Sequence, residues 1–398
     1  MILGIDASNI RGGGGTTHLL EILDCTDPEI YGIKKILIWS GSETLKQIKD
    51  KPYIIKKEIR MLDRSLFFRI CWQVLHFDRI LKKECDIMLC VGGLYFGSFK
   101  PYISMSRNML IFDDIERNRY GFGYTKLRYI ILRLLQKRSF INANGVIFVS
   151  NYAKRFISER LGFKIKNSTV IYHGISGRFT NLPKPQKDIK TYSFEEPFRF
   201  LYISSIDVYK HQWNIAEAVA NLRDSGIPIE ITLAGWVHKK PFERFNKVVE
   251  TRDREKKFIK FLGPVPYDQL PELYRKADAF VYGSTCENMP NILLEAMSAG
   301  LPVACSDFQP MPEILGENGI FFNPESVPDI ERALKLLVSD SELRNLIAFA
   351  AYFRAKEFSW EKCSAETFGF ISRVYSDSFI NAENDRVGGK EPKINTEE

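Results

Sequence analysis

Two glutamates, Glu287 and Glu295, lie eight positions apart in the stretch CENMPNILLEAMSAGLPV. Pro290 between them suits the first turn of a helix, where the missing proline N–H is not needed. Glu287 would then lie in the loop before the helix. Glu295 would lie inside it, where its carboxylate could accept hydrogen bonds from two vicinal hydroxyls. The alternative is that both acids only favour the helix dipole or face solvent. A helix starting there also leaves three backbone N–H groups free to bind a diphosphate, those of Asn291, Ile292 and Leu293.

A glycine run follows the first hydrophobic segment, in the sequence RGGGGTTH at 11–18. Glycines let the backbone approach a bulky anion closely, and the N-terminus of the next helix adds a partial positive charge. The spacing fits neither the G-x-G-x-x-G of dinucleotide enzymes nor the G-x-x-x-x-G-K-[ST] loop. An NAD-linked enzyme is therefore disfavoured, and a merely flexible loop remains the alternative.

A lysine, Lys210, closes the sequence SSIDVYK at 204–210, directly after the strand-like segment FRFLYI. A lysine at the carboxyl end of a strand and just before a helix is well placed to meet a phosphate as a point charge. The alternative is an ordinary solvated surface lysine.

The elements that must position these residues alternate between strand-like and helical segments along the whole chain. This βαβα rhythm predicts parallel sheets covered on both faces, in the α/β class. The polar, proline-bounded stretch 183–197 interrupts the rhythm and is interpreted as a linker. We therefore expect a first doubly wound Rossmann-like domain at 1–182 and a second at 198–360. Ligands of such sheets bind beyond the carboxyl ends of the strands, so the two domains should form a cleft.

Composition is that of an ordinary globular protein, with 398 residues, 45% apolar and 26% charged. Residues 1–200 contain 33 Lys and Arg against 19 Asp and Glu, whereas residues 201–398 contain 23 against 30. The basic half is expected to meet nucleic acid, anionic lipid or a phosphorylated substrate. Seven cysteines form no C-x-x-C pair, and no signal peptide or membrane span is evident. We therefore expect reduced thiols in a cytoplasmic protein without zinc.

The sequence resembles the retaining glycosyltransferases of the GT-B fold in family four, of the bacterial surface-polysaccharide type. The resemblance covers the chain from Met1 to about Phe379, and its most specific part is the E-x7-E signature in ENMPNILLEAMSAGLPV. Further matches are FLGPVPYDQLPELYRKADAFVYGS, PEILGENGIFFNP, FSW, SNYAKRFI, VIYHGI and the glycine run followed by His18. The resemblance implies that a final helix at about 361–380 crosses back onto the first domain. A disordered tail is expected at 381–398.

Roles for single residues follow from this resemblance. Glu287 would contact the hydroxyls of the transferred sugar, Lys210 would neutralise the leaving diphosphate, and His18 is assigned to the catalytic set with them. Glu295 would hold the donor ribose. The expected donor-binding residues are Gly13, Gly14, Ser205, Lys210, Glu287, Asn288, Asn291, Ile292 and Glu295.

One position departs from the family pattern. Ser205 stands five residues before Lys210, where the family usually has an arginine. Arg107, in SMSRNMLIFDD, could supply the missing cation from the other wall of the cleft, or it could contact the acceptor.

The activity implied is transfer of a hexosyl unit from a UDP- or GDP-sugar with retention of configuration. No D-x-D cluster stands in a suitable loop, so neither a metal nor a cofactor is expected. Because no carboxylate is clearly placed as a nucleophile, front-face transfer is favoured over a covalent intermediate.

Two stretches of the first half interleave cations with apolar residues, namely DRSLFFRICWQVLHFDRILKK and YTKLRYIILRLLQKR. Basic amphipathic helices can lie in a membrane interface. This favours a lipid-linked saccharide acceptor at the inner face of the cell membrane, in O-antigen or other surface-polysaccharide synthesis. The alternative is that the apolar faces of these helices cover the sheet.

Two other classes of protein remain open at this point. A GT-B sugar-nucleotide-binding scaffold, catalytically weak or inactive, would keep the same fold, and Ser205 slightly favours it. A nucleic-acid-binding protein could use the basic half, but no RNA or DNA motif is present and the second half is acidic, so no nucleic-acid partner is expected.

Overall fold

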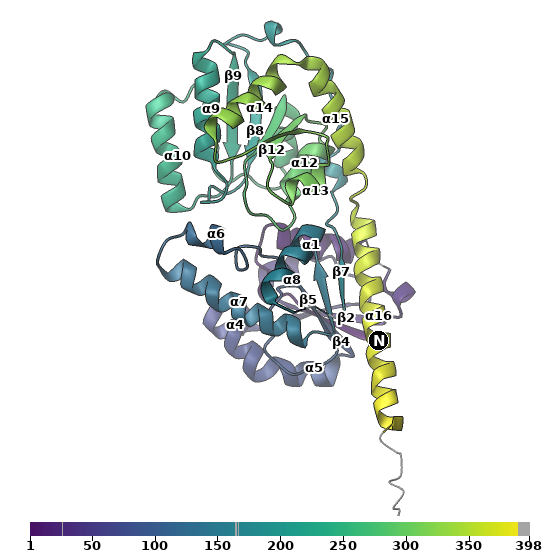
Figure 1. Cartoon of the computed structure of the whole chain (residues 1–398). Coiled ribbons are helices and arrows are strands. Elements are labelled where there is room, and N and C mark those ends of the chain that lie inside the picture. Colours follow the sequence, from purple (N-terminus) through teal and green to yellow (C-terminus); the bar gives the residue numbers. More distant parts are fainter. Residues whose placement is uncertain (26, 164, 166, 389–398) are drawn as a thin grey trace, which may run out of the picture.

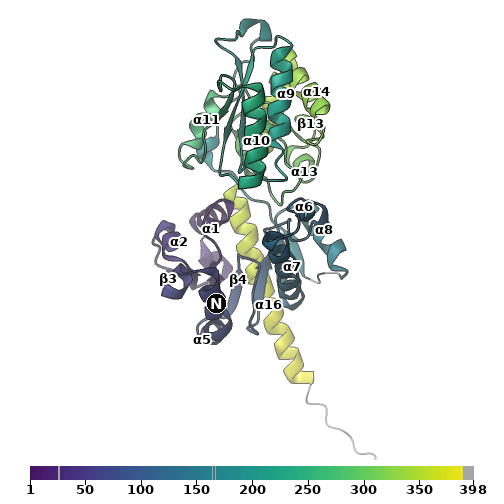
Figure 2. The ribbon, with the colours of Figure 1, turned by 90° about the vertical axis from the view of Figure 1, so that its left-hand side faces the viewer.

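The computed structural model describes residues 1–25, 27–163, 165 and 167–388. It has two α/β lobes stacked one above the other, and a long C-terminal helix runs from their junction along the first lobe (Figure 1, Figure 2). Each lobe has its own sheet of parallel strands, seven in the first lobe and six in the second. The expected fold class, two Rossmann-like units that face each other, is therefore confirmed.

The sheet of the first lobe has the order β3-β2-β1-β4-β5-β6-β7, and all its pairs are parallel. Its central strands are buried at every position, as expected where helices cover both faces. The strands are β1 (Ile2–Asp6), β2 (Lys35–Ser40), β3 (Ile54–Glu58), β4 (Ile87–Cys90), β5 (Tyr102–Met105), β6 (Gly145–Phe148) and β7 (Ser168–Val170).

The helices of the first lobe cover both faces of this sheet. One continuous helical stretch consists of α4 (Leu66–Trp72), the π-helical segment η2 (Gln73–Phe77) and α5 (Asp78–Glu84). The other helical elements are α1 (Gly14–Asp24), η1 (Pro28–Tyr31), α2 (Ser42–Gln47), α3 (Arg60–Asp63), α6 (Asp114–Asn118), α7 (Tyr124–Asn142), α8 (Asn151–Leu161) and η3 (Gly177–Phe179). Within the described residues, no helix combines the length and the hydropathy that crossing a membrane requires.

The second lobe has the strand order β10-β9-β8-β11-β12-β13, again with parallel pairs throughout. Its strands are β8 (Phe198–Ile203), β9 (Ile229–Ala234), β10 (Ile259–Phe261), β11 (Ala279–Tyr282), β12 (Val303–Ser306) and β13 (Ile320–Phe322). Its helices are α9 (Gln212–Asp224), α10 (Lys239–Arg252), α11 (Leu270–Lys276), α12 (Asn291–Ser298), α13 (Met311–Leu315), α14 (Val327–Ser339) and α15 (Ser341–Ala355).

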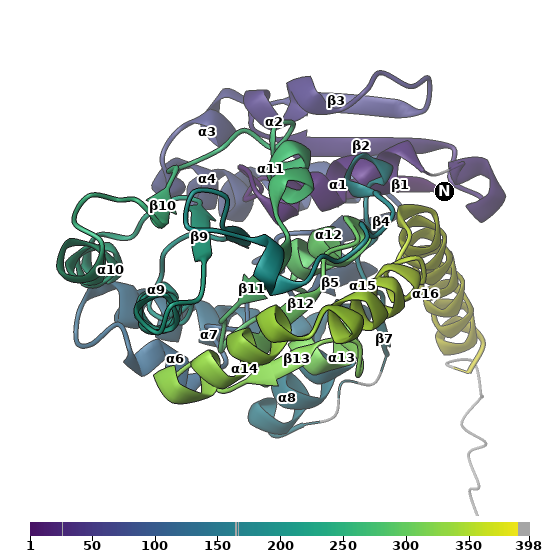
Figure 3. The ribbon, with the colours of Figure 1, turned by 90° about the horizontal axis from the view of Figure 1, so that it is seen from above.

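The last helix, α16 (Trp360–Gly388), crosses back onto the first lobe (Figure 1, Figure 3). The Ser364 hydroxyl donates to the carbonyl of Ile22 at 2.8 Å, and a Cβ added at Gly145 would lie 2.9 Å from the Phe370 ring. The expected crossover is thus present. The expectation of a tail from 381 is wrong as far as Gly388, because the helix continues to that residue; 389–398 lie outside the described residues.

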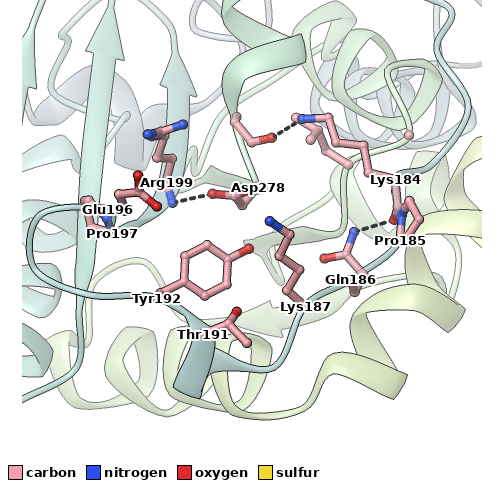
Figure 4. Close-up of a pocket in the computed structure, with 13 residues that line it drawn as sticks. Lys184, Pro185, Gln186, Lys187, Thr191, Tyr192, Glu196, Pro197, Arg199 and Asp278 are labelled. Carbon is pink, nitrogen blue, oxygen red and sulfur yellow. Dashed lines mark hydrogen bonds between the residues drawn. The ribbon is translucent and has the colours of Figure 1, made fainter.

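The stretch expected to be a linker lies against the second lobe and contains one short helical turn, η4 (Ile189–Thr191). The buried guanidinium of Arg344 in α15 donates to the side chain of Gln186 at 3.1 Å and to the carbonyl of Leu337 at 2.8 Å. A small cavity of about 240 Å³ lies beside this stretch, at the amino ends of the strands. There Asp278 accepts from the backbone N–H of Arg199 at 2.9 Å (Figure 4). The exact domain limits remain a prediction.

The carboxyl ends of the two sheets face each other. The Asn288 side chain, in the loop after β11, donates to the carbonyl of Ser106 after β5 at 2.9 Å. The Ser150 hydroxyl, after β6, donates to the carbonyl of Asn288 at 2.8 Å. Tyr120 of the first lobe donates to Asp207, after β8, at 3.0 Å. The strand-end loops that carry the candidate residues therefore meet between the lobes.

Candidate active site

A cleft of about 480 Å³ opens between the lobes, and it brings together five residues that the sequence placed in the donor set. The glycine run and the start of α1 form one wall. The start of α12 and the side chain of Glu295 form the other. The five residues are Gly13, Gly14, Asn291, Ile292 and Glu295.

The structure explains why glycine stands at two positions of this loop. Gly13 caps α1 with a φ of 62°, in the left-handed region where a side chain is strained. A Cβ at Gly14 would lie 3.0 Å from the side-chain amide of Asn291, so glycine at this position allows the loop to approach α12 closely. The run therefore sets the width of the cleft.

The start of α12 corrects one expectation about its backbone. Asn291 is the first helical residue, and its N–H donates to the carbonyl of Met289 at 3.1 Å. The N–H of Leu293 donates to the carbonyl of Pro290 at 3.0 Å. A tight first turn thus uses two of the three amides expected to be free. Among the described residues, no acceptor contacts the N–H of Ile292.

Glu295 lies one turn inside α12 and is 4% exposed. Its Oε2 accepts a hydrogen bond from Tyr274 at 2.9 Å. Burial raises the pKa of this carboxyl to about 8, although hydrogen bonds from Tyr274 and Tyr267 and the positive charge of Arg178 oppose the shift. A carboxyl group held at the wall of a cleft in this way can bind a pair of hydroxyl donors.

Glu287 and Lys210 lie together at the carboxyl edge of the second sheet, and neither lines the 480 Å³ cleft. The Lys210 ammonium contacts Glu287 Oε1 and donates to Tyr282 at 2.9 Å. Ser284 donates to the same carboxylate oxygen at 2.6 Å, as does Tyr282. No side chain among the described residues contacts Glu287 Oε2. The free oxygen and the buried ammonium are thus the groups that a substrate could engage.

His18 lies beneath the glycine loop and is 1% exposed. Burial and the neighbouring His173 and Arg107 lower its pKa well below the usual value, so its ring is neutral. Arg107 contacts His18 Nδ1 at 3.2 Å and donates to the carbonyl of Gly14 at 3.0 Å. His173 in turn contacts the Asn291 side chain at 2.9 Å. This buried cluster supports both walls of the cleft.

The structure does not bring Arg107 to Ser205. The carbonyl of Ser205 accepts from Gln212 at 2.9 Å, whereas Arg107 is committed to the glycine loop. Burial lowers the pKa of Arg107 to about 10, and the group remains a cation at neutral pH. Whether it contacts a donor phosphate or the acceptor remains a prediction.

Sequence reasoning missed several residues of the cleft. Arg178, in η3, lines it, with its guanidinium 5.2 Å from the Tyr267 ring centre. Tyr267 and Trp360 line the same cleft. Tyr267 and Trp360 lie inside the segments FLGPVPYDQL and FSW that were matched to the family, and Arg178 follows VIYHGI, but no spacing within these segments singles the residues out.

Part of the chain is similar in sequence to known glycosyltransferases. A family model described as glycosyl transferases group 1 matches residues 184–352. The chain is 38% identical over 121 residues to O-antigen chain mannosyltransferase B of Escherichia coli, over 30% of this chain and 32% of that protein. It is 24% identical over 254 residues to an uncharacterized glycosyltransferase of Methanocaldococcus jannaschii, over 63% of each chain. The aligned segments thus span less than two thirds of either relative.

Solved structures of glycosyltransferases share the fold over almost the whole chain. Sucrose-phosphate synthase from Thermosynechococcus elongatus superposes with a TM-score of 0.73 at 16% identity, covering 96% of this chain and 100% of that one. Anabaena HepE, solved with UDP and glucose, gives 0.66 at 17% identity with the same coverage. The family match over residues 184–352 and the shared GT-B fold confirm the resemblance found in the sequence: residues 184–352 are similar to the group 1 glycosyltransferases, and the chain has the GT-B fold.

Proposed function

We propose that this protein transfers a hexosyl unit from a UDP- or GDP-sugar to a saccharide acceptor, with retention of configuration. The observation that carries the proposal is the 480 Å³ cleft, in which a buried carboxyl, Glu295, faces a glycine loop across the start of α12. A ribose diol fits the carboxyl, and the glycine loop leaves room for a diphosphate. The names of the relatives, one an O-antigen mannosyltransferase and one a HepE structure with UDP and glucose, support the substrate class.

The ion pair between Lys210 and Glu287 gives the proposal a specific first step. When a donor binds, its diphosphate takes the place of Glu287 beside the Lys210 ammonium. The carboxylate of Glu287 is then free to accept hydrogen bonds from the sugar hydroxyls. Tyr282 contacts both groups and can keep each of them in place during this exchange.

The chemistry follows from these positions. The bond between the anomeric carbon and the diphosphate oxygen breaks, and an acceptor oxygen forms a bond to that carbon on the same face. The acceptor proton passes to the departing diphosphate, whose growing charge Lys210 stabilises. Loss of one such electrostatic contact costs on the order of 3 kcal/mol of barrier.

The test is release of UDP or GDP from a panel of nucleotide sugars, with a lipid-linked saccharide as acceptor. The product's anomeric configuration is read by NMR spectroscopy. A nucleotide sugar that raises the melting temperature without release of its nucleotide would favour the inactive binding scaffold. Inversion at the anomeric carbon would refute the retaining mechanism.

We further propose that the first lobe docks on an anionic membrane surface, which places the enzyme at the inner face of the cell membrane beside a lipid-linked acceptor. Helix α7 buries only Gln136, Ser139 and Phe140, so most of its apolar residues do not cover the sheet. Leu134 is 63% exposed, and Phe67 in α4 is 70% exposed. Figure 1 shows α4 and α7 on the same side of the first lobe.

Lys137 and Arg138 follow Leu134 in the sequence of α7, and the first half of the chain is basic. The expected result is flotation of the protein with phosphatidylglycerol vesicles at low salt. Leu127→Ser combined with Leu134→Ser should reduce it. A matched control is Leu346→Ser, which changes a leucine that is 68% exposed on α15 of the other lobe. Equal flotation of both variants would contradict the proposal that this surface docks on the membrane.

A further inference from the structure

A second cleft between the lobes, of about 810 Å³, shares no lining residue with the first. The segment from Arg119 to Tyr129, which runs from the end of α6 into the first turns of α7, contributes one wall. The starts of α9 and α10 form the other, and Figure 1 shows the lower end of α10 facing α6 across this space. The loop after β8, which also carries Lys210, contributes Asp207 and Val208.

The second cleft has a large excess of positive charge. Asp207 is its one acidic lining residue, and it already accepts from Tyr120 at 3.0 Å and contacts His238 at 3.4 Å. Arg119 is paired with Glu116 and Glu325. Among the described residues, no acid pairs with any of the other four lining cations, Arg128, Lys239, Lys240 and Arg244.

The N-terminus of α10 opens into this cleft without a cap. His238 makes no side-chain capping bond, and the first turn has no acid. It carries Lys239 and Lys240 instead, so both cations stand at the positive end of a 14-residue helix. No acceptor contacts the backbone N–H of either lysine in the described part of the chain. Charges of the wrong sign at a helix N-terminus are unfavourable by themselves, and an anion would relieve them.

Aromatic side chains border the cations. The guanidinium of Arg244 lies 4.4 Å from the centre of the Trp213 ring. Partial burial, and after it the positive charge of Arg119, lowers the pKa of Arg244. Tyr124, on the opposite wall, is 77% exposed. Amphipathic rings of this kind suit a ligand that has both an apolar face and polar groups, such as a sugar.

We propose that the second cleft binds the phosphate or diphosphate group of the acceptor, through the uncapped start of α10 and the cations Lys239, Lys240 and Arg244. This inference rests on the proposed function, because it assigns the acceptor's chemical class. The loop after β8 connects this cleft to the ion pair of Lys210 and Glu287: Tyr209, two residues after Asp207, has its ring centre 5.0 Å from the Lys210 ammonium. An acceptor anchored here by its phosphate would extend its sugar past this loop toward Glu287.

The test is calorimetric titration in the presence of excess UDP, which keeps the donor site filled. The probes are glucose 1-phosphate, as a soluble sugar phosphate, and farnesyl diphosphate, as a lipid diphosphate. Methyl glucoside and farnesol are the uncharged controls. Lys239→Gln combined with Lys240→Gln should weaken the anionic probes about tenfold or more, because hydrogen bonds to charged groups are lost. Lys247→Gln, an exposed lysine of the same helix outside the cleft, is the matched control.

The source of the phosphate is identified by the anionic probe that binds the wild type more tightly and whose affinity falls more in the double variant. Equal affinity of the wild type and the double variant for both probes would overturn the inference, as would the absence of any binding to the wild type. The melting shift caused by UDP and the release of UDP are measured on the same variants. Failure of those measurements alone would refute the proposed function and leave the anion site standing.

Discussion

The buried carboxyl of Glu295 makes the affinity for the donor nucleotide depend on pH in a way that can be calculated. Its pKa is about 8, whereas a ribose diol is best held by the ionised form, which only accepts hydrogen bonds. At pH 7 about one molecule in eleven is ionised, and at pH 9 about ten in eleven. Because apparent affinity scales with the competent fraction, UDP should bind about tenfold more tightly at pH 9 than at pH 7.

The perturbation is Glu295→Gln, which keeps the size of the side chain but cannot ionise. At pH 9 the variant should bind UDP about tenfold or more weakly than the wild type does, because a hydrogen bond to a charged acceptor is lost. The difference should vanish toward pH 6. Calorimetric titration with UDP from pH 6 to 9 measures both proteins, and the ratio of their dissociation constants removes the ionisation of UDP itself. A ratio that stays constant across this range would refute the reasoning.

The same carboxyl affects stability, and the sign follows from its raised pKa. Between the ordinary value of 4.5 and about 8, the folded protein holds a proton that the unfolded chain has released. The free energy of unfolding should therefore fall as pH rises through this window, by up to about 1.4 kcal/mol per pH unit. Glu295→Gln should show a flatter dependence in urea unfolding. A steeper decline in the variant would contradict the assigned protonation state.

Three further predictions concern other contacts. Lys210→Ala should lower kcat by about 10²-fold to 10³-fold, measured by nucleotide release, since the leaving diphosphate loses its cation; an unchanged kcat would exclude that role. Gly174→Ala should destabilise the protein by about 1–3 kcal/mol, because the new Cβ would lie 2.1 Å from the backbone nitrogen of Trp360. Gly177→Ala meets nothing within 4 Å and serves as its control in thermal unfolding. Arg344→Met should lower the free energy of unfolding by about 2–4 kcal/mol, measured in urea, because buried carbonyls near the linker lose their donor. The surface substitution Arg275→Met is the control. A smaller loss of stability for Arg344→Met than for this control would show that other contacts hold the linker.

The elements that the sequence predicted best are those with strong patterns. Buried runs such as ILGID and DIMLCV became central strands, since a parallel sheet covered on both faces needs continuous apolar segments. The edge strands β3 and β10 have weak local patterns. β3 has the sequence IIKKE, whose exposed edge position tolerates charges, and β10 is only three residues long. The apolar sequence pattern that predicts a strand is weak wherever the strand is short or half exposed to solvent.

The sequence alone determined the fold class, the E-x7-E pair and the lysine before α9, because these depend on residue types at fixed spacings. Only the tertiary structure decided that Glu287 and Lys210 contact each other, that Arg107 holds the glycine loop, and that Arg178 joins the cleft. It also revealed the charged second cleft, whose walls come from segments about a hundred residues apart in the chain. Contacts between distant segments depend on how two lobes pack, and no local pattern encodes that packing.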